Sequence, residues 1–283
     1  MTFVVFMCAA TSALLHACWN MLAQRNRAPR DMLCGFSLAT AALCAIAFPF
    51  IGAPGSQTWP WIGMASLANV FYLRALGKAY AHPDFLAAYA IVRSTVPAML
   101  FLSGMLAFSE PGRLGAFIGL AAVVIGILIF AMPQDQLHRL NRKTLAHSVF
   151  AGVLLALALF LDVNGIRAAG GTFTDLLRYA VLSSLTTAVG LAMLGFMNRA
   201  NPMLVLIVNG RQCITGAFLL LASYLLGMWA YAQGPIGMVA PVRESSILFG
   251  GLLSALVLRQ YVTRIQWTAM ALATIGILLV QAG

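Results

Sequence analysis

The sequence predicts an all-α integral membrane protein, with ten transmembrane helices arranged as two inverted five-helix repeats. Composition, the spacing of apolar stretches and an internal repeat each point to this fold class. Of the 283 residues, 61% are hydrophobic and only 8% are charged, and the mean hydropathy is +0.91. A soluble chain of this length needs far more polar residues to face water. The composition therefore excludes a soluble enzyme, a disordered chain and a nucleic-acid-binding domain.

Ten apolar stretches are each long enough to cross a bilayer, which takes roughly 20 residues of helix. They cover residues 3–23, 32–51, 60–81, 85–107, 114–132, 145–167, 175–196, 209–232, 235–258 and 264–281. Most connections between them are short, and the longest and most charged one lies near the middle of the chain. It divides the chain into a first five-helix repeat (1–132), a charged linker (133–144) and a second five-helix repeat (145–283).

A shift of 150 residues aligns the two halves. It places Leu76-Gly77 on Leu226-Gly227, Arg93 on Arg243, and Ile125-Gly126-Ile127-Leu128 on Ile275-Gly276-Ile277-Leu278. Aliphatic matches arise easily by chance, whereas two matched arginines inside apolar spans do not. Because five spans is an odd number, the second repeat must enter the membrane in the opposite direction. Inverted repeats are typical of transporters with a binding site near the bilayer midplane.

Loop charges predict that both termini lie outside a bacterial-type cytoplasmic membrane, since Lys and Arg collect in cytoplasmic loops. One side holds ten basic residues: Arg25, Arg27, Arg30, Arg139, Arg142, Lys143, Arg199, Arg211, Arg259 and Arg264. The other side holds three: Arg113, Arg167 and Arg178. The same rule explains the net charge of +10 without a nucleic-acid partner.

The reactive residues do not form a catalytic or metal-binding pattern. The five cysteines lie in apolar stretches without CxxC spacing, the four histidines are scattered, and no GxxxxGK[ST] loop occurs. We therefore expect a secondary carrier with no catalytic residues, no metal and no cofactor. A membrane-embedded enzyme and a channel are the alternatives. An enzyme would need a constellation such as HExxH or paired aspartates, which the sequence lacks. A channel needs rings of polar groups or a filter, and an inverted repeat with midplane charges fits alternating access better.

Two arginines are the first candidates for a substrate site. A charge near the bilayer centre costs ~2.5–3.5 kcal/mol on insertion scales, so each one suggests a function. Arg93 and Arg243 both lie about 12 Å along their spans at 1.5 Å per residue. Across a pseudo-twofold axis, two guanidiniums favour a carboxylate, phosphonate or phosphate group. The alternative is that each arginine is held in a structural pair, Arg243 with Glu244 or Arg93 with Asp162.

Glu244 is the only acid near the centre of a span, which makes it a candidate for coupling transport to protons. A permanent counter-ion is the alternative. Adjacent helical residues point about 100° apart, so Arg93 is better placed than Arg243 to pair with Glu244. His16 is the second coupling candidate.

His16, Trp19 and Asn20 share one turn of the first span and are expected to contribute to the substrate site. They either face the central cavity or form an interhelical hydrogen bond. Tyr89, one turn before Arg93, either lines the cavity or anchors its helix at the membrane–water interface.

In the sixth span, Asp162 and Arg167 are expected to form a structural polar cluster, because they are only five residues apart.

Three motifs carry a family resemblance. They are His16-Ala17-Cys18-Trp19-Asn20, Asp162-Val163-Asn164-Gly165-Ile166-Arg167 and Val242-Arg243-Glu244-Ser245-Ser246-Ile247-Leu248-Phe249. Together with the duplicated ten-span plan, they make the chain resemble the EamA branch of the drug/metabolite transporter superfamily. Two positions depart from that family, because Ser109-Glu110 and Arg259-Gln260 stand where its repeats usually have Gly-Glu. The absence of basic termini is a further departure from many members.

The resemblance implies a secondary transporter that exports amino acids or related anionic or zwitterionic metabolites by alternating access. Transport of phosphonate-type organic anions, in either direction, is the alternative. The expected partners are the small-molecule substrate, the lipid bilayer and, if transport is coupled, protons. The oligomeric state is left open between a monomer and a homodimer.

Overall fold

The computed structural model describes residues 1–26, 29–79, 85–131, 142–197, 201–257 and 262–282. These residues form helices joined by short connections, without a β-strand in the described ranges. The helices are α1 (Phe3–Gln24), α2 (Pro29–Ile51), α3 (Trp59–Ala79), α4 (Phe85–Phe108), α5 (Leu114–Ala131), α6 (Arg142–Ala168), α7 (Phe173–Met197), α8 (Pro202–Val208), α9 (Gly210–Gln233), α10 (Ile236–Glu244), α11 (Ser246–Val257) and α12 (Arg264–Ala282), with a 3-10 turn at Ser56–Thr58.

Eight helical segments are long and apolar enough to cross a membrane, which confirms a multi-pass all-α membrane protein. They are Phe3–Gln24, Asp31–Ile51, Ala90–Phe108, Arg142–Ala168, Phe173–Met193, Gly210–Gln233, Ile236–Val257 and Arg264–Ala282. The expected spans 60–81 and 114–132 correspond to α3 and α5, which lie outside this set. The α3 segment carries Arg74 and Lys78, and the apolar part of α5 is short.

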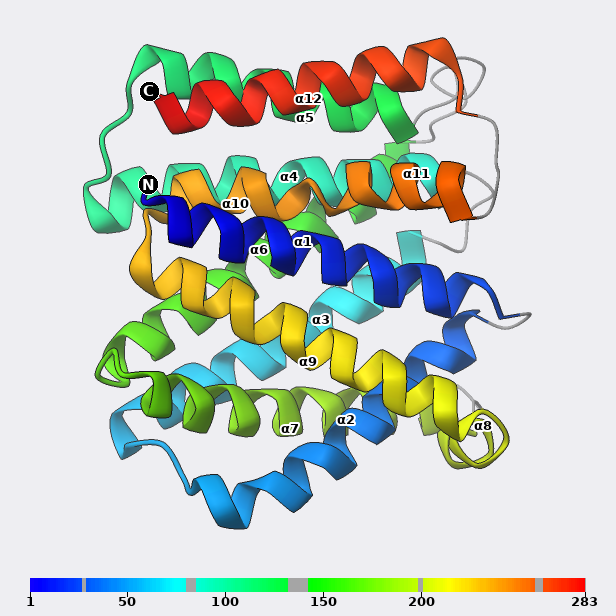
Figure 1. Ribbon diagram of the computed structural model, residues 1–283. Helices are drawn as coiled ribbons and strands as arrows, with labels where there is room; N and C mark the ends of the chain where they lie inside the picture. Colours follow the sequence, from blue (N-terminus) through cyan, green and yellow to red (C-terminus); the bar gives the residue numbers. More distant parts are fainter. Residues whose placement is uncertain (27–28, 80–84, 132–141, 198–200, 258–261, 283) are drawn as a thin grey trace.

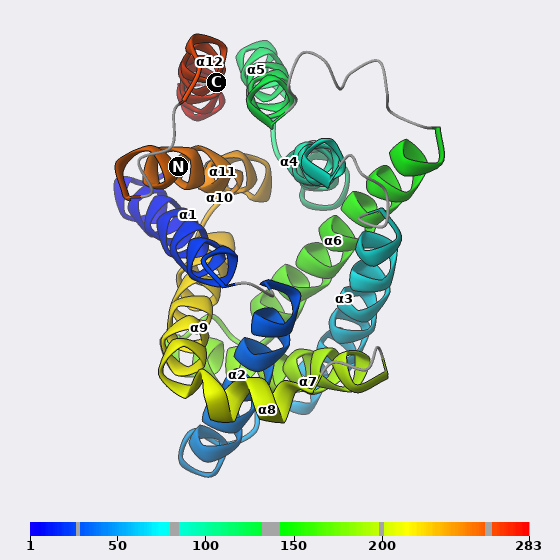
Figure 2. The ribbon, with the colours of Figure 1, turned by 90° about the vertical axis from the view of Figure 1, so that its right-hand side faces the viewer.

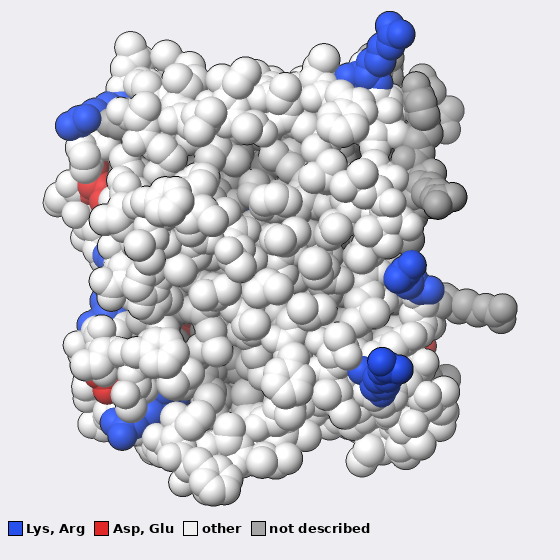
Figure 3. Space-filling model, viewed as in Figure 1, with Lys and Arg blue, Asp and Glu red and all other residues white. Residues whose placement is uncertain are grey.

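The charge distribution fits a membrane belt. Figure 3 shows Lys, Arg, Asp and Glu gathered at two opposite ends of this face, with a broad uncharged band between them. Both termini lie at the same end of the bundle (Figure 1), as an even number of membrane crossings requires.

Two features differ from the expected spans. The connection after the seventh span contains the short helix α8, which begins at the Asn201 N-cap and was expected to be loop. The ninth span is broken at Ser245 into α10 and α11. The Ser245 hydroxyl donates to the Val242 carbonyl at 2.6 Å, which satisfies one of the backbone groups left at the end of α10.

The main helix pairs each join the first half of the chain to the second. The α5 helix packs against α12, α4 against α10, α1 against α9, α3 against α6, and α2 against α7. Figure 2 shows α5 and α12 side by side at one edge, with α4 and α10 next to them.

Glycines allow the close approach of α5 and α12. A methyl group on Gly119 would lie 2.6 Å from the Gly276 carbonyl oxygen, and one on Gly276 would lie 2.6 Å from the Gly119 carbonyl oxygen. About two turns further along α5, a methyl on Gly126 would lie 2.8 Å from the Ala269 carbonyl oxygen. Small residues at such contacts let membrane helices pack backbone to backbone.

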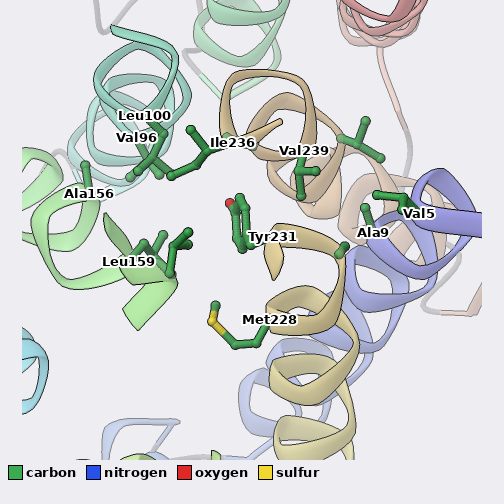
Figure 4. Close-up of a cluster of buried hydrophobic side chains, with 14 of the residues drawn as sticks. Val5, Ala9, Val96, Leu100, Ala156, Leu159, Met228, Tyr231, Ile236 and Val239 are labelled. Carbon is green, nitrogen blue, oxygen red and sulfur yellow. The ribbon is translucent and has the colours of Figure 1, made fainter. Parts of the chain in front are cut away.

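A buried apolar cluster fills the space between α1, α4, α6, α9 and α10. Figure 4 shows the Tyr231 ring at its centre, with Val96 and Leu100 of α4 on one side and Leu159 of α6 on another. This cluster supports the polar residues described next.

Two charged residues hold the turn between α9 and α10. Arg167 donates to the Tyr231 and Gly234 carbonyls at 3.2 and 3.1 Å. The C-terminal end of a helix carries a partial negative charge, which favours a cation at this end of α9. Glu110 accepts from the Ile236 and Gly237 amides at 2.6 and 2.9 Å and so caps the start of α10.

Candidate functional site

A buried ion pair joins α4 to α10 inside the bundle. Arg93 Nη1 lies 3.0 Å from Glu244 Oε2, and the two residues are 9% and 2% exposed. This contact confirms the prediction that Arg93, rather than Arg243, is the partner of Glu244. The pairing offsets two charges that would each be costly alone in an apolar environment.

His16 connects α1 to the same ion pair. Its Nε2 contacts Arg93 Nη2. A guanidinium nitrogen can only donate, so the imidazole nitrogen is the acceptor in this contact. The Trp19 ring meets the His16 ring edge to face, with centroids 4.7 Å apart. Helices α1, α4 and α10 are thus joined through one polar contact chain.

Asn20 has a local role. Its amide donates to the His16 carbonyl of the same helix at 2.9 Å, so the bond is within α1 instead of between helices. Tyr89, the other aromatic candidate, has a side chain that lies outside the part of the chain that the structure describes.

Arg243 is turned away from Glu244 and toward α9. Its guanidinium carbon lies 5.6 Å from the centre of the Tyr231 ring. A methyl group on Gly227 would lie 2.8 Å from Arg243 Nε, so this glycine provides the space that the guanidinium occupies. Within the described residues, Arg243 forms no ion pair. The alternative that pairs Arg243 with Glu244 is therefore not the arrangement found.

Reciprocal hydrogen bonds fix α1 to α9 beside Arg243. The Ser12 hydroxyl donates to the Ser223 carbonyl at 2.6 Å, and the Ser223 hydroxyl donates to the Ser12 carbonyl at 2.8 Å. Sequence reasoning missed both residues, because an isolated serine in an apolar span does not reveal which helix it faces.

Asp162 lies in a separate hydroxyl cluster between α6, α7 and α9. The residue is 3% exposed, and its Oδ1 accepts from the Tyr179 hydroxyl at 2.9 Å and the Ser183 hydroxyl at 3.1 Å. The Tyr224 hydroxyl donates to Ser183 at 3.2 Å. Tyr179 and Ser183 are four residues apart on α7, so they lie on one helical face. This spacing is the sequence feature from which a shared polar face could have been predicted.

Asp162 and Arg167 do not form the cluster that was expected from their spacing in the sequence. Arg167 binds the α9 carbonyls described above and lies 4.2 Å from the centre of the Phe108 ring, whereas Asp162 binds hydroxyls of α7. The two side chains have no partner in common among the described contacts. Proximity in sequence did not bring them together, because five positions on a helix differ by about 140° in direction.

The fold and these contacts define a multi-pass α-helical membrane protein with a polar centre that contains Arg93, Arg243 and Glu244, and with a separate buried acid, Asp162. The sequence matches no protein-family model, and no curated protein gives a significant match. A solved crystal structure is similar in fold, with a TM-score of 0.72 over 100% of this chain and 98% of that chain. The two sequences are 13% identical, so the likeness establishes a shared fold alone.

Proposed function

We propose that the protein is a secondary membrane transporter of small metabolites that carry a negatively charged group. The observation that carries the proposal is the buried Arg93–Glu244 pair with the partly buried Arg243 beside it, in the middle of an apolar bundle. Ionisable residues inside a membrane protein are costly and mark substrate or ion pathways.

A ten-span inverted repeat is part of this proposal, with α10 and α11 counted as one span and α8 outside the membrane. The 150-residue shift exchanges the Gly119–Gly276 contact with the Ala269–Gly126 contact. It likewise exchanges the α1–α9 pair with the α6–α3 pair. Contacts that map onto each other in this way are expected when two units are related by a twofold axis in the membrane plane.

The broken helix supports a binding role for its two charged residues. Arg243 and Glu244 are the last residues of α10, directly before the break at Ser245. Transporters tolerate such breaks within the membrane where the backbone lines a binding site. Rocking of one repeat against the other would then expose the site to each side in turn.

The charges indicate the substrate. Glu244 offsets Arg93, whereas Arg243 has no acidic ion-pair partner among the described residues. Arg243 is therefore the group available to hold a carboxylate, which it can bind with two parallel hydrogen bonds. We propose export of amino acids or related anionic or zwitterionic compounds, in a bacterial-type cytoplasmic membrane. Phosphonate-type organic anions, imported or exported, are the alternative substrate class.

Uptake into proteoliposomes tests the proposal. The panel contains the standard amino acids and simple alkylphosphonates, each measured with and without a pH gradient. Arg243→Gln and Arg93→Gln are expected to lower transport at least about tenfold, as expected for loss of a charge-assisted hydrogen bond. Arg113→Gln, which changes an exposed arginine in the same way, is the matched control. Absence of wild-type transport across the panel, or wild-type rates in both site variants, would overturn the proposal.

A further inference from the structure

Asp162 is a buried acid whose charge is not offset by an ion pair among the described residues. Both hydrogen bonds that it receives from these residues end on the same oxygen, Oδ1. The donors are the neutral hydroxyls of Tyr179 and Ser183. Hydroxyl groups stabilise a carboxylate but bring no positive charge, so a buried acid with such neighbours favours a cation as an additional partner.

Asp162 and Arg243 lie along one face of α9. Tyr224, Gly227 and Tyr231 share that face, because they are spaced at three and four residues. Tyr224 bonds into the Asp162 cluster through Ser183, while Gly227 and Tyr231 contact Arg243. The rise from Tyr224 to Gly227 is about 4.5 Å at 1.5 Å per residue. The acid and the arginine thus adjoin the same face of α9 without forming a direct ion pair.

We propose that Asp162 is the cation subsite of the transport site and holds the ammonium group of a zwitterionic substrate, whose carboxylate binds Arg243. This inference rests on the proposed function and deepens it. A zwitterion supplies one positive and one negative group, so it partners both side chains without adding net charge to a low-dielectric site. A phosphonate without an amino group leaves Asp162 without a cation and adds negative charge near it. The arrangement therefore favours amino acids over simple organic anions.

The test compares each amino acid with its deaminated and decarboxylated counterparts. Affinity is measured on the purified full-length protein by ligand-induced thermal shift and by competition in counterflow exchange. The variants are Asp162→Asn and, as a control with the same chemical change, Asp175→Asn at the start of α7, where the side chain is only partly buried. In wild type, at least one amino acid should bind more tightly than both of its counterparts.

Asp162→Asn should weaken binding of that amino acid at least about tenfold and leave binding of the deaminated acid within about twofold of wild type. Asp175→Asn should behave like wild type. Asp162→Glu, which keeps the charge, should retain the preference for the ammonium group, and it provides the readout if Asp162→Asn does not fold. An equal loss of both ligands in Asp162→Asn, or no ammonium preference in Asp162→Glu, would overturn the inference.

Two further outcomes separate this inference from the proposed function. If wild type binds alkylphosphonates but no amino acid, the cation subsite is wrong while the transporter proposal stands. Suppose that uptake occurs in sodium but not in potassium, and that Asp162→Asn removes this dependence while the preference for the ammonium group is unchanged. Asp162 then binds sodium, and the assignment is overturned. If wild type transports nothing in the panel, the proposed function itself fails.

Discussion

Glu244 pairs with Arg93, 151 positions earlier in the chain, and not with Arg243, its neighbour in sequence. Adjacent residues on a helix point about 100° apart, so Glu244 faces α4 while Arg243 faces α9. One acid thus offsets the first arginine, and the second arginine has no acidic ion-pair partner among the described residues.

Neutralising one member of this pair should destabilise the protein more than neutralising both. Arg93→Gln or Glu244→Gln leaves a buried charge without its partner, at a cost of ~3–5 kcal/mol. In the double variant the two amides can hydrogen-bond, so stability should largely recover. Thermal unfolding of the four proteins in detergent measures this. If the double variant loses as much stability as the two single variants added together, the two charges do not stabilise the protein as a pair.

Glu244 should be the residue that couples transport to protons. A substrate carboxylate held by Arg243 brings negative charge next to Glu244 and so favours uptake of a proton there, and this linkage must be reciprocal. Glu244→Gln should abolish pH-gradient-driven uptake but preserve exchange of labelled for unlabelled substrate. Glu244→Asp, which keeps a titratable group, should retain gradient-driven uptake. Loss of both activities in Glu244→Gln would indicate a structural ion pair, and unchanged gradient-driven uptake would make His16 the next candidate.

A methyl group at Gly227 should displace Arg243. It would lie 2.8 Å from Arg243 Nε and 2.8 Å from Ser12 Oγ, so the guanidinium has to move. Gly227→Ala should therefore lower transport at least about tenfold, as expected from misplacing a charged hydrogen-bond donor. Gly63→Ala in α3 is the matched control, because a methyl there meets nothing within 4 Å. Equal transport by the two variants would contradict the position of Arg243.

The contact between α5 and α12 should not tolerate an added methyl group. In Gly119→Ala the new carbon would meet the backbone of Gly276 and Val280, at 2.6 and 2.7 Å, so the helices must separate. We expect a loss of ~1–3 kcal/mol, typical of overpacking. Gly126→Ala should behave similarly, whereas Gly250→Ala in α11 meets nothing within 4 Å and should be neutral. The comparison is made by thermal unfolding, and a neutral Gly119→Ala would argue against this close packing.

Orientation in the membrane is predicted from loop charges, with both termini outside. Ser56 lies in the connection between α2 and α3, at the same end as the termini, and Gln24 lies at the opposite end of α1. In a cysteine-free background, Ser56→Cys should react with an impermeant thiol reagent added to intact cells, and Gln24→Cys should be protected. The reverse labelling pattern would invert the orientation and leave the fold unaffected.

Composition and hydropathy were sufficient to predict the class of protein, the approximate helices and the costly charges within them. Hydropathy and length are local properties, and a bilayer imposes them on every span. The preference of Glu244 for Arg93 over Arg243 also followed from the geometry of a single helix.

Which side chains meet across helices could not be predicted in this way and became known from the three-dimensional packing. These contacts depend on how each helix is rotated and where it crosses its neighbour. Examples are the Asp162 hydroxyl cluster, the Ser12–Ser223 pair and the separate partners of Asp162 and Arg167. Lipid tails are as apolar as the helix surfaces, so hydropathy does not specify those rotations. They are set by close packing, as at Gly119 and Gly276, and by hydrogen bonds between helices that lie far apart in the sequence.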